Sequence, residues 1–225
     1  MSLGTFSEDP QTAWLAAPAD STDRNMALLR DFWFQDPDGT TWLAPAGSVV
    51  NGASIPAPLW STVGSPYTGP YRRASIVHDV ACDAADHAAD PQAARSATDH
   101  MFYQACRAGG CSIAQAELLY AGVRIGAWLP RIHLWSQPMQ AALLATNRTL
   151  PDVPEESVRT TYREIAADLR ARPSARSFRQ LEILVNSHLE AKAAQHQPSS
   201  LKAHPLRIAR PALSPKPRPR TKTKP

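Results

Sequence analysis

The sequence predicts a mainly helical α+β fold, in which an N-terminal β-hairpin and an ordered loop pack on antiparallel helices and a disordered C-terminal tail follows. Residues 28–44 partly alternate apolar and polar side chains on either side of a DPDG turn, which is typical of a hairpin. Several stretches between residues 71 and 194 place apolar side chains at three- and four-residue spacing, which is typical of amphipathic helices. Residues 197–225 hold seven prolines and eight basic residues with no acidic one, a composition that cannot bury a core.

The chain divides into four predicted segments. Residues 1–27 form an irregular N-terminal segment, because two prolines interrupt any helix there. Residues 28–130 form the core domain with the His-Asp helix, residues 131–196 a helical extension, and residues 197–225 the tail. This division fits one domain of ordinary size with additions.

Turn and cap residues set the expected boundaries of the elements. A glycine and two prolines within residues 51–60 exclude a helix interior and predict a rigid turn. Gly109 and Gly110 end one helix, and Pro130 ends the next. The predicted elements, in order, are strands at 28–35 and 40–44 and helices at 71–84, 92–108, 112–128, 139–146, 155–172 and 177–194.

Charge is unevenly distributed along the chain. There are 24 basic and 20 acidic residues, but eight of the basic ones lie in the tail, so the first 196 residues are net acidic. We expect the tail to attract anionic surfaces such as phospholipid. It has no aromatic residues between its charges, so we expect no specific nucleic-acid binding. The oligomeric state is left open.

The sequence shows no sign of a membrane span or of a disulfide framework. No apolar run approaches the roughly 20 residues that cross a bilayer, and the N-terminus MSLGTFSEDPQ lacks the basic start and apolar region of a signal peptide. We therefore expect a soluble chain made in the cytoplasm, with delivery elsewhere left open. The cysteines, Cys82, Cys106 and Cys111, are too few for a disulfide framework. We expect them to be reduced, with Cys106 and Cys111 the only pair close enough in sequence to oxidise.

The stretch YRRASIVHDVACDA, residues 71–84, places His78 and Asp79 side by side in an otherwise apolar helix. Neighbours on a helix diverge by roughly 100°, so the two side chains can serve adjoining points such as a water and a metal. We expect His78 to lie at the edge of the buried stripe, partly desolvated, where a histidine can act as a general base. The alternative is a core histidine bonded to a carbonyl. The expected stripe is Ala74, Val77, Ala81 and Ala84.

A second carboxylate, Asp99, lies about twenty residues beyond His78 on the helix that a short connection brings back beside the first. If it accepts the imidazole N–H, it fixes the tautomer and leaves the other ring nitrogen free to take a proton. The loops that precede the His78 helix could aim backbone groups at a ligand. The further candidates are Asn51, Gly52, Gly64 and Gly69 for the loops, and Tyr103 and Tyr120 for contacts behind the site.

Other chemistries fit the sequence poorly. A metal phosphohydrolase with an HD pair needs a histidine upstream, yet His78 is the first histidine of the chain. A zinc site could be sought in His78, Cys82, Asp83 and His87. These residues point to different faces of the helix, and no CxxC or HExxH pattern accompanies them. A serine hydrolase through Ser54 or Ser75 lacks the G-x-S-x-G turn.

The runs NGASIPAPLW, YRRASIVHD, ATDHMFYQA and YAGVRIGA resemble a family of uncharacterised proteins common in phages and bacterial genomes. The shared core of that family is a GASIP-type turn followed by an HD helix, and the resemblance covers residues 28–127. It implies architecture rather than activity, because the family has no settled one. Asn51 stands where the family usually has aspartate, which would weaken that position as a ligand.

The same residues are more weakly similar to secreted phospholipase A2 enzymes. There a histidine activates water, the adjacent aspartate binds calcium with carbonyls of an upstream glycine-rich loop, and an aspartate on an antiparallel helix orients the histidine. The resemblance implies catalytic roles for His78 and Asp99 and a calcium ligand in Asp79. The usual tyrosine-glycine-glycine pattern of the calcium loop is missing, and the cysteine pattern around the aspartates differs.

Two functions of different class remain open. One is a calcium-assisted lipid-ester hydrolase acting on phospholipid. The other is a non-catalytic, phage-type structural or interaction protein, in which His78, Asp79 and Asp99 form a buried polar network. The hydrolase requires Asp99 within hydrogen-bond distance of His78, with Asp79 facing a solvent-open loop.

Overall fold

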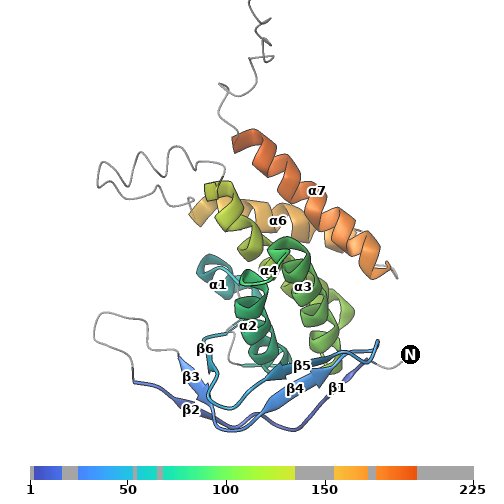
Figure 1. The fold of residues 1–225 in the computed structure, drawn as a ribbon. Coiled ribbons are helices and arrows are strands. Elements are labelled where there is room, and N and C mark those ends of the chain that lie inside the picture. Colours follow the sequence, from blue (N-terminus) through green and yellow to red (C-terminus); the bar gives the residue numbers. More distant parts are fainter. Residues whose placement is uncertain are drawn as a thin grey trace, which may run out of the picture.

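The fold is mainly helical α+β, as predicted, with a small β layer packed against one end of a group of helices (Figure 1). It is seen in a computed structural model that describes residues 3–16, 25–52, 55–64, 68–134, 155–171 and 176–196. The strands are β1 (Thr5–Phe6), β2 (Thr12–Trp14), β3 (Met26–Leu28), β4 (Phe32–Gln35), β5 (Thr41–Ala44) and β6 (Val49–Val50). The helices are η1 (Ala57–Leu59, 3-10), α1 (Trp60–Val63), α2 (Arg72–Asp86), α3 (Pro91–Ala108), α4 (Ile113–Leu134), α6 (Glu155–Ala171) and α7 (Phe178–His196).

The β layer consists of two three-stranded antiparallel sheets, with strand orders β1-β4-β5 and β2-β3-β6. The predicted hairpin is present as β4 and β5, which pair from Phe32 with Ala44 to Gln35 with Thr41. Its turn is closed by Asp36, whose Oδ1 accepts the Asp38 and Thr40 amides at 3.0 and 2.9 Å. The DPDG prediction is therefore confirmed.

Two expectations for the N-terminal region were wrong. The segment expected to be irregular contributes β1, β2 and β3 to the sheets. The strand expected at 28–35 is two strands, β3 and β4, which belong to different sheets. Strands of two or three residues are too short to show a period, and they form because β4 and β6 supply their hydrogen bonds across the fold.

The helices α2 and α3 pack against each other and are joined by a short connection, as predicted. Asp90 caps α3 by accepting the Gln92 and Ala93 amides at 3.1 and 3.0 Å, and Pro91 occupies the first turn, where its missing N–H costs nothing. α4 packs on α3 and also contacts α6 and α7. These two helices lie at the end of the molecule opposite the sheets (Figure 1). The core between these elements is apolar, with Phe34, Phe102, Tyr120 and Ile165 almost fully buried.

The third helix does not end where expected. α4 continues through Pro130 to Leu134. A proline inside a helix costs about 3 kcal/mol. Local preferences alone therefore predict that the helix ends before Pro130. α4 packs against α3, α6 and α7, and a local pattern does not reveal these contacts. The helix predicted at 139–146 and the tail from residue 197 lie outside the described residues.

Candidate functional site

The structure brings His78 and Asp99 together. His78 lies on α2 and Asp99 on α3, and the His78 Nε2 atom is 2.9 Å from Asp99 Oδ1. Both side chains have no exposed surface. The antiparallel pairing of α2 and α3 produces this contact, because it returns the chain to the level of His78 after 21 residues.

Asp99 also binds an arginine that was not among the predicted site residues. Arg124, on α4, donates from Nη1 to Asp99 Oδ2 at 2.9 Å and from Nη2 to Asn186 Oδ1, on α7, at 3.0 Å. Arg95, one turn before Asp99 on α3, has its Nε 4.0 Å from Asp99 Oδ1 and an Nη1 3.5 Å from Asp86. A single buried carboxylate is thus surrounded by three basic side chains and joins α2, α3, α4 and, through Arg124, α7.

His78 lies deeper than its sequence position suggested. The expected stripe was only partly correct, since Ala74 and Val77 are buried but Ala84 is exposed. The buried face of α2 includes Cys82 instead, and its Sγ is 3.6 Å from each imidazole nitrogen of His78. The centroid of the His78 ring lies 4.6 Å from that of Phe102. Thus Nδ1, the nitrogen left free by Asp99, faces a thiol.

The surroundings of His78 favour its protonated form over the neutral form that a general base requires. Burial opposes protonation of the imidazole, but neighbouring Cys82 and the hydrogen bond to Asp99 outweigh it and raise the pKa of His78 to about 10. The direction follows from the geometry, because an imidazolium donates to a buried carboxylate. These contacts therefore favour the doubly protonated ring, and in that form neither nitrogen can accept another proton.

Asp79 faces the loop, as expected, but it accepts amides there. Its Oδ2 accepts the Asn51 N–H at 2.6 Å, and the Gly52 amide is a second donor. Burial raises the pKa of Asp79 to about 6, although these amides and the nearby His78 favour the ionised form. Asp79 therefore anchors the chain between β6 and η1 to the middle of α2.

The described loop groups that contact Asp79 are amide donors rather than oxygen ligands. Calcium is coordinated by six to eight oxygen atoms, whereas the loop offers N–H donors to the Asp79 carboxylate. Gly64 and Gly69 lie elsewhere, against the ring of Tyr71, where a side chain on Gly64 would collide with the phenol oxygen at 2.5 Å. Among the described residues, no three His, Cys, Asp or Glu side chains gather as a metal site would require.

The two tyrosines expected behind the site belong to an aromatic cluster. The rings of Tyr103 and Tyr120 pack edge to face at 6.4 Å, and Phe178 of α7 contacts both. The Tyr120 hydroxyl is buried and has no hydrogen-bond partner within the described part of the chain. Burial raises the pKa of the Tyr120 phenol, and Arg124 and Asp99 are among the charges that act on it, so Tyr120 lies close to the network.

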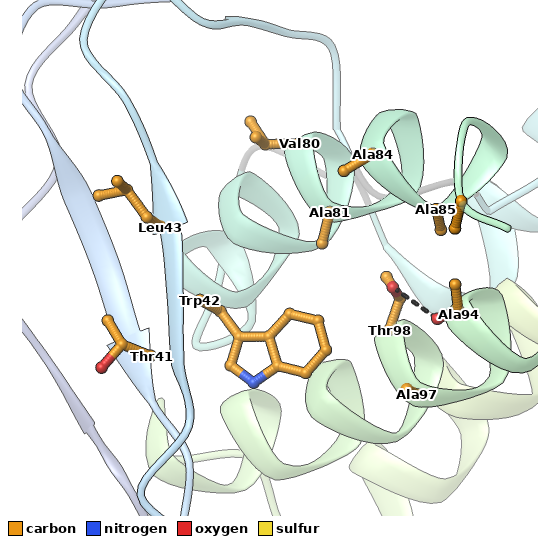
Figure 2. Close-up of a pocket in the computed structure, with 11 residues that line it drawn as sticks. Thr41, Trp42, Leu43, Val80, Ala81, Ala84, Ala85, Ala94, Ala97 and Thr98 are labelled. Atoms are coloured by element: carbon orange, nitrogen blue, oxygen red, sulfur yellow. Dashed lines mark hydrogen bonds between the residues drawn. The ribbon is translucent and has the colours of Figure 1, made fainter.

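An open apolar groove of about 330 Å³ lies on another side of α2 (Figure 2). The indole of Trp42 reaches from β5 toward α2 and α3, whose alanines form much of the remaining wall. Ala81, which lines the groove, is two residues beyond Asp79 on α2, and two steps of 100° place it about 200° away around the helix. The groove and the Asp79 carboxylate therefore lie on different sides of α2.

Some of the network could have been found from the sequence. Arg124 is the single charge in the apolar stretch YAGVRIGAW, and an isolated charge in such a stretch must find a counter-charge when buried. Arg95 and Asp99 show the four-residue spacing of a helical ion pair. Asn186 has no such signal, because its role depends on where α7 docks.

Comparisons with known proteins give a family without a known activity. Residues 26–123 match a family described as "Protein of unknown function (DUF1353)". Two uncharacterized proteins of Sinorhizobium fredii (strain NBRC 101917 / NGR234) are similar. The protein y4jT is 36% identical over 122 residues, which is 54% of this chain and 33% of that protein. The protein y4iH is 33% identical over 106 residues, which is 47% of this chain and 41% of that protein.

The matched region covers less than half the length of either relative. No solved structure matches the chain. The family resemblance stated from the sequence is thus supported as far as a family of unknown function with uncharacterised relatives. None of the helices that the structure describes is long and apolar enough to cross a bilayer.

Proposed function

We propose that the chain is a non-catalytic structural or interaction protein, in which His78, Asp99 and Arg124 form a buried charged network that fixes the arrangement of its helices. The observation that carries this proposal is the state of His78. Its ring is fully buried, its Nε2 is bonded to Asp99, and its Nδ1 faces Cys82. A general base must reach a water or a substrate proton with an unprotonated nitrogen, and this ring offers none.

The charges around Asp99 support the same function. A catalytic aspartate beside a histidine stabilises the imidazolium that forms during the reaction. Here Arg124 already donates to Asp99, and the surroundings of His78 raise its pKa and so favour the imidazolium before any reaction begins. Buried ion pairs of this kind add little net stability compared with apolar packing, but removal of one partner is costly. A network that joins four helices therefore selects one arrangement of them.

A lipid-ester hydrolase remains the second candidate because of one specific observation. The 2.9 Å contact between His78 and Asp99, with Asp79 at the adjacent loop, matches the arrangement that the phospholipase A2 resemblance implies. For catalysis, His78 would have to lose its proton and exchange Cys82 for a water. Calcium would have to displace the Asn51 amide from Asp79.

The deciding experiment combines a spectroscopic and an enzymatic measurement. The ¹⁵N chemical shifts of the His78 ring, assigned by comparison with His78→Gln, report whether one or both nitrogens carry a proton between pH 6 and 9. In parallel, hydrolysis of zwitterionic and anionic phospholipid vesicles is followed with calcium and with chelator for wild type, His78→Gln and Asp99→Asn.

The proposal expects an imidazolium across this pH range, no hydrolysis above the buffer rate, and the same melting temperature with calcium as with chelator. His188→Gln is the matched control, because His188 forms an equally short contact with Asp168 at the surface. A neutral His78 ring at pH 7, together with calcium-dependent hydrolysis that His78→Gln abolishes and His188→Gln preserves, would establish the hydrolase instead.

A further inference from the structure

The C-terminus of α3 brings two of the three cysteines together. The sequence CRAGGC, residues 106–111, ends the helix with Gly110 at a φ of +101°, a conformation that glycine adopts without strain. The Cys111 amide donates to the Cys106 carbonyl at 3.0 Å, and the Gly110 amide donates to the Arg107 carbonyl at 3.2 Å. These two bonds define a Schellman motif, which places the side chains before and after the turn in contact.

Both side chains at this contact are thiols. Cys106 and Cys111 are almost fully buried, and their side chains are hydrogen-bonded to each other. The third cysteine, Cys82, lies beside His78 and has no thiol partner. The helix cap has therefore placed the two sulfur atoms of a possible disulfide next to each other in the reduced protein.

We propose that Cys106 and Cys111 form an oxidative modification site, at which hydrogen peroxide converts the two thiols into a disulfide across the end of α3. The site is separate from the His78 network, and the proposal does not depend on whether that network is catalytic. Cys106 and Cys111 are also the pair that their sequence spacing marked as able to oxidise.

The surroundings assign different roles to the two thiols. The hydrogen bond from Cys106 lowers the pKa of Cys111, and the Arg107 guanidinium adds to this effect, although burial opposes it. Burial raises the pKa of Cys106, and the bond to Cys111 raises it further. Arg107 is held in place because it also donates to the Cys111 carbonyl. Cys111 is thus the sulfur that attacks the peroxide, and Cys106 is the one that resolves the product.

The reaction has two balanced steps. The Cys111 thiolate attacks one peroxide oxygen, so that an S–O bond forms, the O–O bond breaks and the other oxygen leaves as water after protonation; sulfur loses two electrons to the peroxide. Cys106 sulfur then attacks the sulfenic acid, so that the S–S bond forms, the S–O bond breaks and the hydroxyl leaves as water with the Cys106 proton. One peroxide and two thiols give one disulfide and two waters.

The position of the site gives the modification a structural consequence. A side chain on Gly109 would lie 2.2 Å from the Pro70 carbonyl, so the α3 cap is in direct contact with the residues that lead into α2. Tyr71, the next residue, is buried close to both thiols; burial raises the pKa of its phenol, and the nearby thiols raise it further. Oxidation therefore acts where the chain enters the His78 helix.

Mass spectrometry of the full chain tests the proposal directly. The native protein is treated with hydrogen peroxide, denatured, alkylated and digested with trypsin without reduction. Trypsin cuts after Arg107, between the two cysteines, so the expected disulfide joins residues 96–107 to residues 108–124. We expect the free thiols to fall from three to one, with full recovery on addition of dithiothreitol.

Three variants separate this site from general oxidation. Cys82→Ser should leave the cross-linked product unchanged. Cys106→Ser should accumulate a sulfenic acid on Cys111 that dimedone traps, whereas Cys111→Ser should leave Cys106 as a thiol. The proposal is wrong if wild type keeps all three thiols under peroxide, if Cys82 is the cysteine that reacts first, or if Cys111 is converted to sulfinic acid without cross-linking. The wild-type result decides even if a variant does not fold.

Discussion

Asp79 lies on the histidine helix α2 and Asp99 on the neighbouring helix α3, and the partners of the two carboxylates differ in kind. Asp99 is fully buried and is neutralised by side chains, chiefly His78 and Arg124. Asp79 lies nearer the surface and is bound by backbone amides of the Asn51 loop. The comparison teaches that an HD pair does not identify its own role. The side chains and amides that other segments bring to it decide whether it can act on a ligand.

The largest effect is expected when the buried charge of Asp99 is removed. Asp99→Asn leaves Arg124 with a buried charge that no carboxylate balances, and such losses cost roughly 3–5 kcal/mol. The free energy of unfolding, measured with urea, should fall by that amount. Asp168→Asn is the control, because its 2.9 Å contact with His188 is exposed and should contribute at most about 1 kcal/mol. Equal losses in the two variants would show that the buried network contributes no more to stability than the surface pair.

A second test uses the pH dependence of stability. The pKa of His78 rises from 6.5 in the unfolded chain to about 10 in the fold, so its contribution is complete below pH 6.5 and is lost as the pH rises toward 10. In that window the folded state holds more protons, and the wild type should lose stability with increasing pH. His78→Gln should show a shallower decline in urea titrations at pH 7, 8 and 9. Parallel declines would contradict a protonated His78.

A smaller effect is expected at Asp79. Its pKa is raised from 3.8 to about 6, so the protonated form is favoured by folding and stability should fall as the pH rises between those values. Asp79→Asn keeps an oxygen that can accept the Asn51 amide and removes this titration. Thermal unfolding at pH 4, 5, 6 and 7 should therefore show a drop in wild type that is weaker in the variant. A variant that melts far earlier at every pH would mean that the charge itself holds the loop.

The smallest effect is expected on the third side of α2. Ala84 is exposed in the groove wall and touches neither carboxylate network. Ala84→Ser should change the free energy of unfolding by less than about 0.5 kcal/mol, as is usual for surface positions. A loss as large as that of Asp79→Asn would show that the groove is part of the packed core rather than an open surface.

Local chemistry explains which parts of the fold were predictable. The DPDG turn and the existence of helices α2, α3, α6 and α7 depend on neighbouring residues, and the structure contains them. The short strands β1 to β3 and the passage of α4 through Pro130 depend on partners far along the chain. No pattern within a few residues could indicate them.

The same distinction applies to the candidate site. The spacing of His78 and Asp99 on adjacent helices was sufficient to foresee their contact. The protonation of His78 was not foreseen, because it depends on Cys82, one turn away, and on a carboxylate whose other oxygen is bound by Arg124. The orientation of the Asn51 loop was equally hidden, since the sequence does not tell whether a turn presents carbonyls or amides.

The contact between Arg124 and Asn186 sets a lower limit on the autonomous folding unit. The region shared with the family ends at residue 123, one residue before the arginine that binds Asp99 and reaches α7. A fragment cut at that boundary would keep the histidine and the aspartate but would lose the cation and the helix that complete their surroundings. Excision of the shared region alone should therefore give a chain that does not reach the native packing of α2 and α3, and expression of this domain should extend at least to His196.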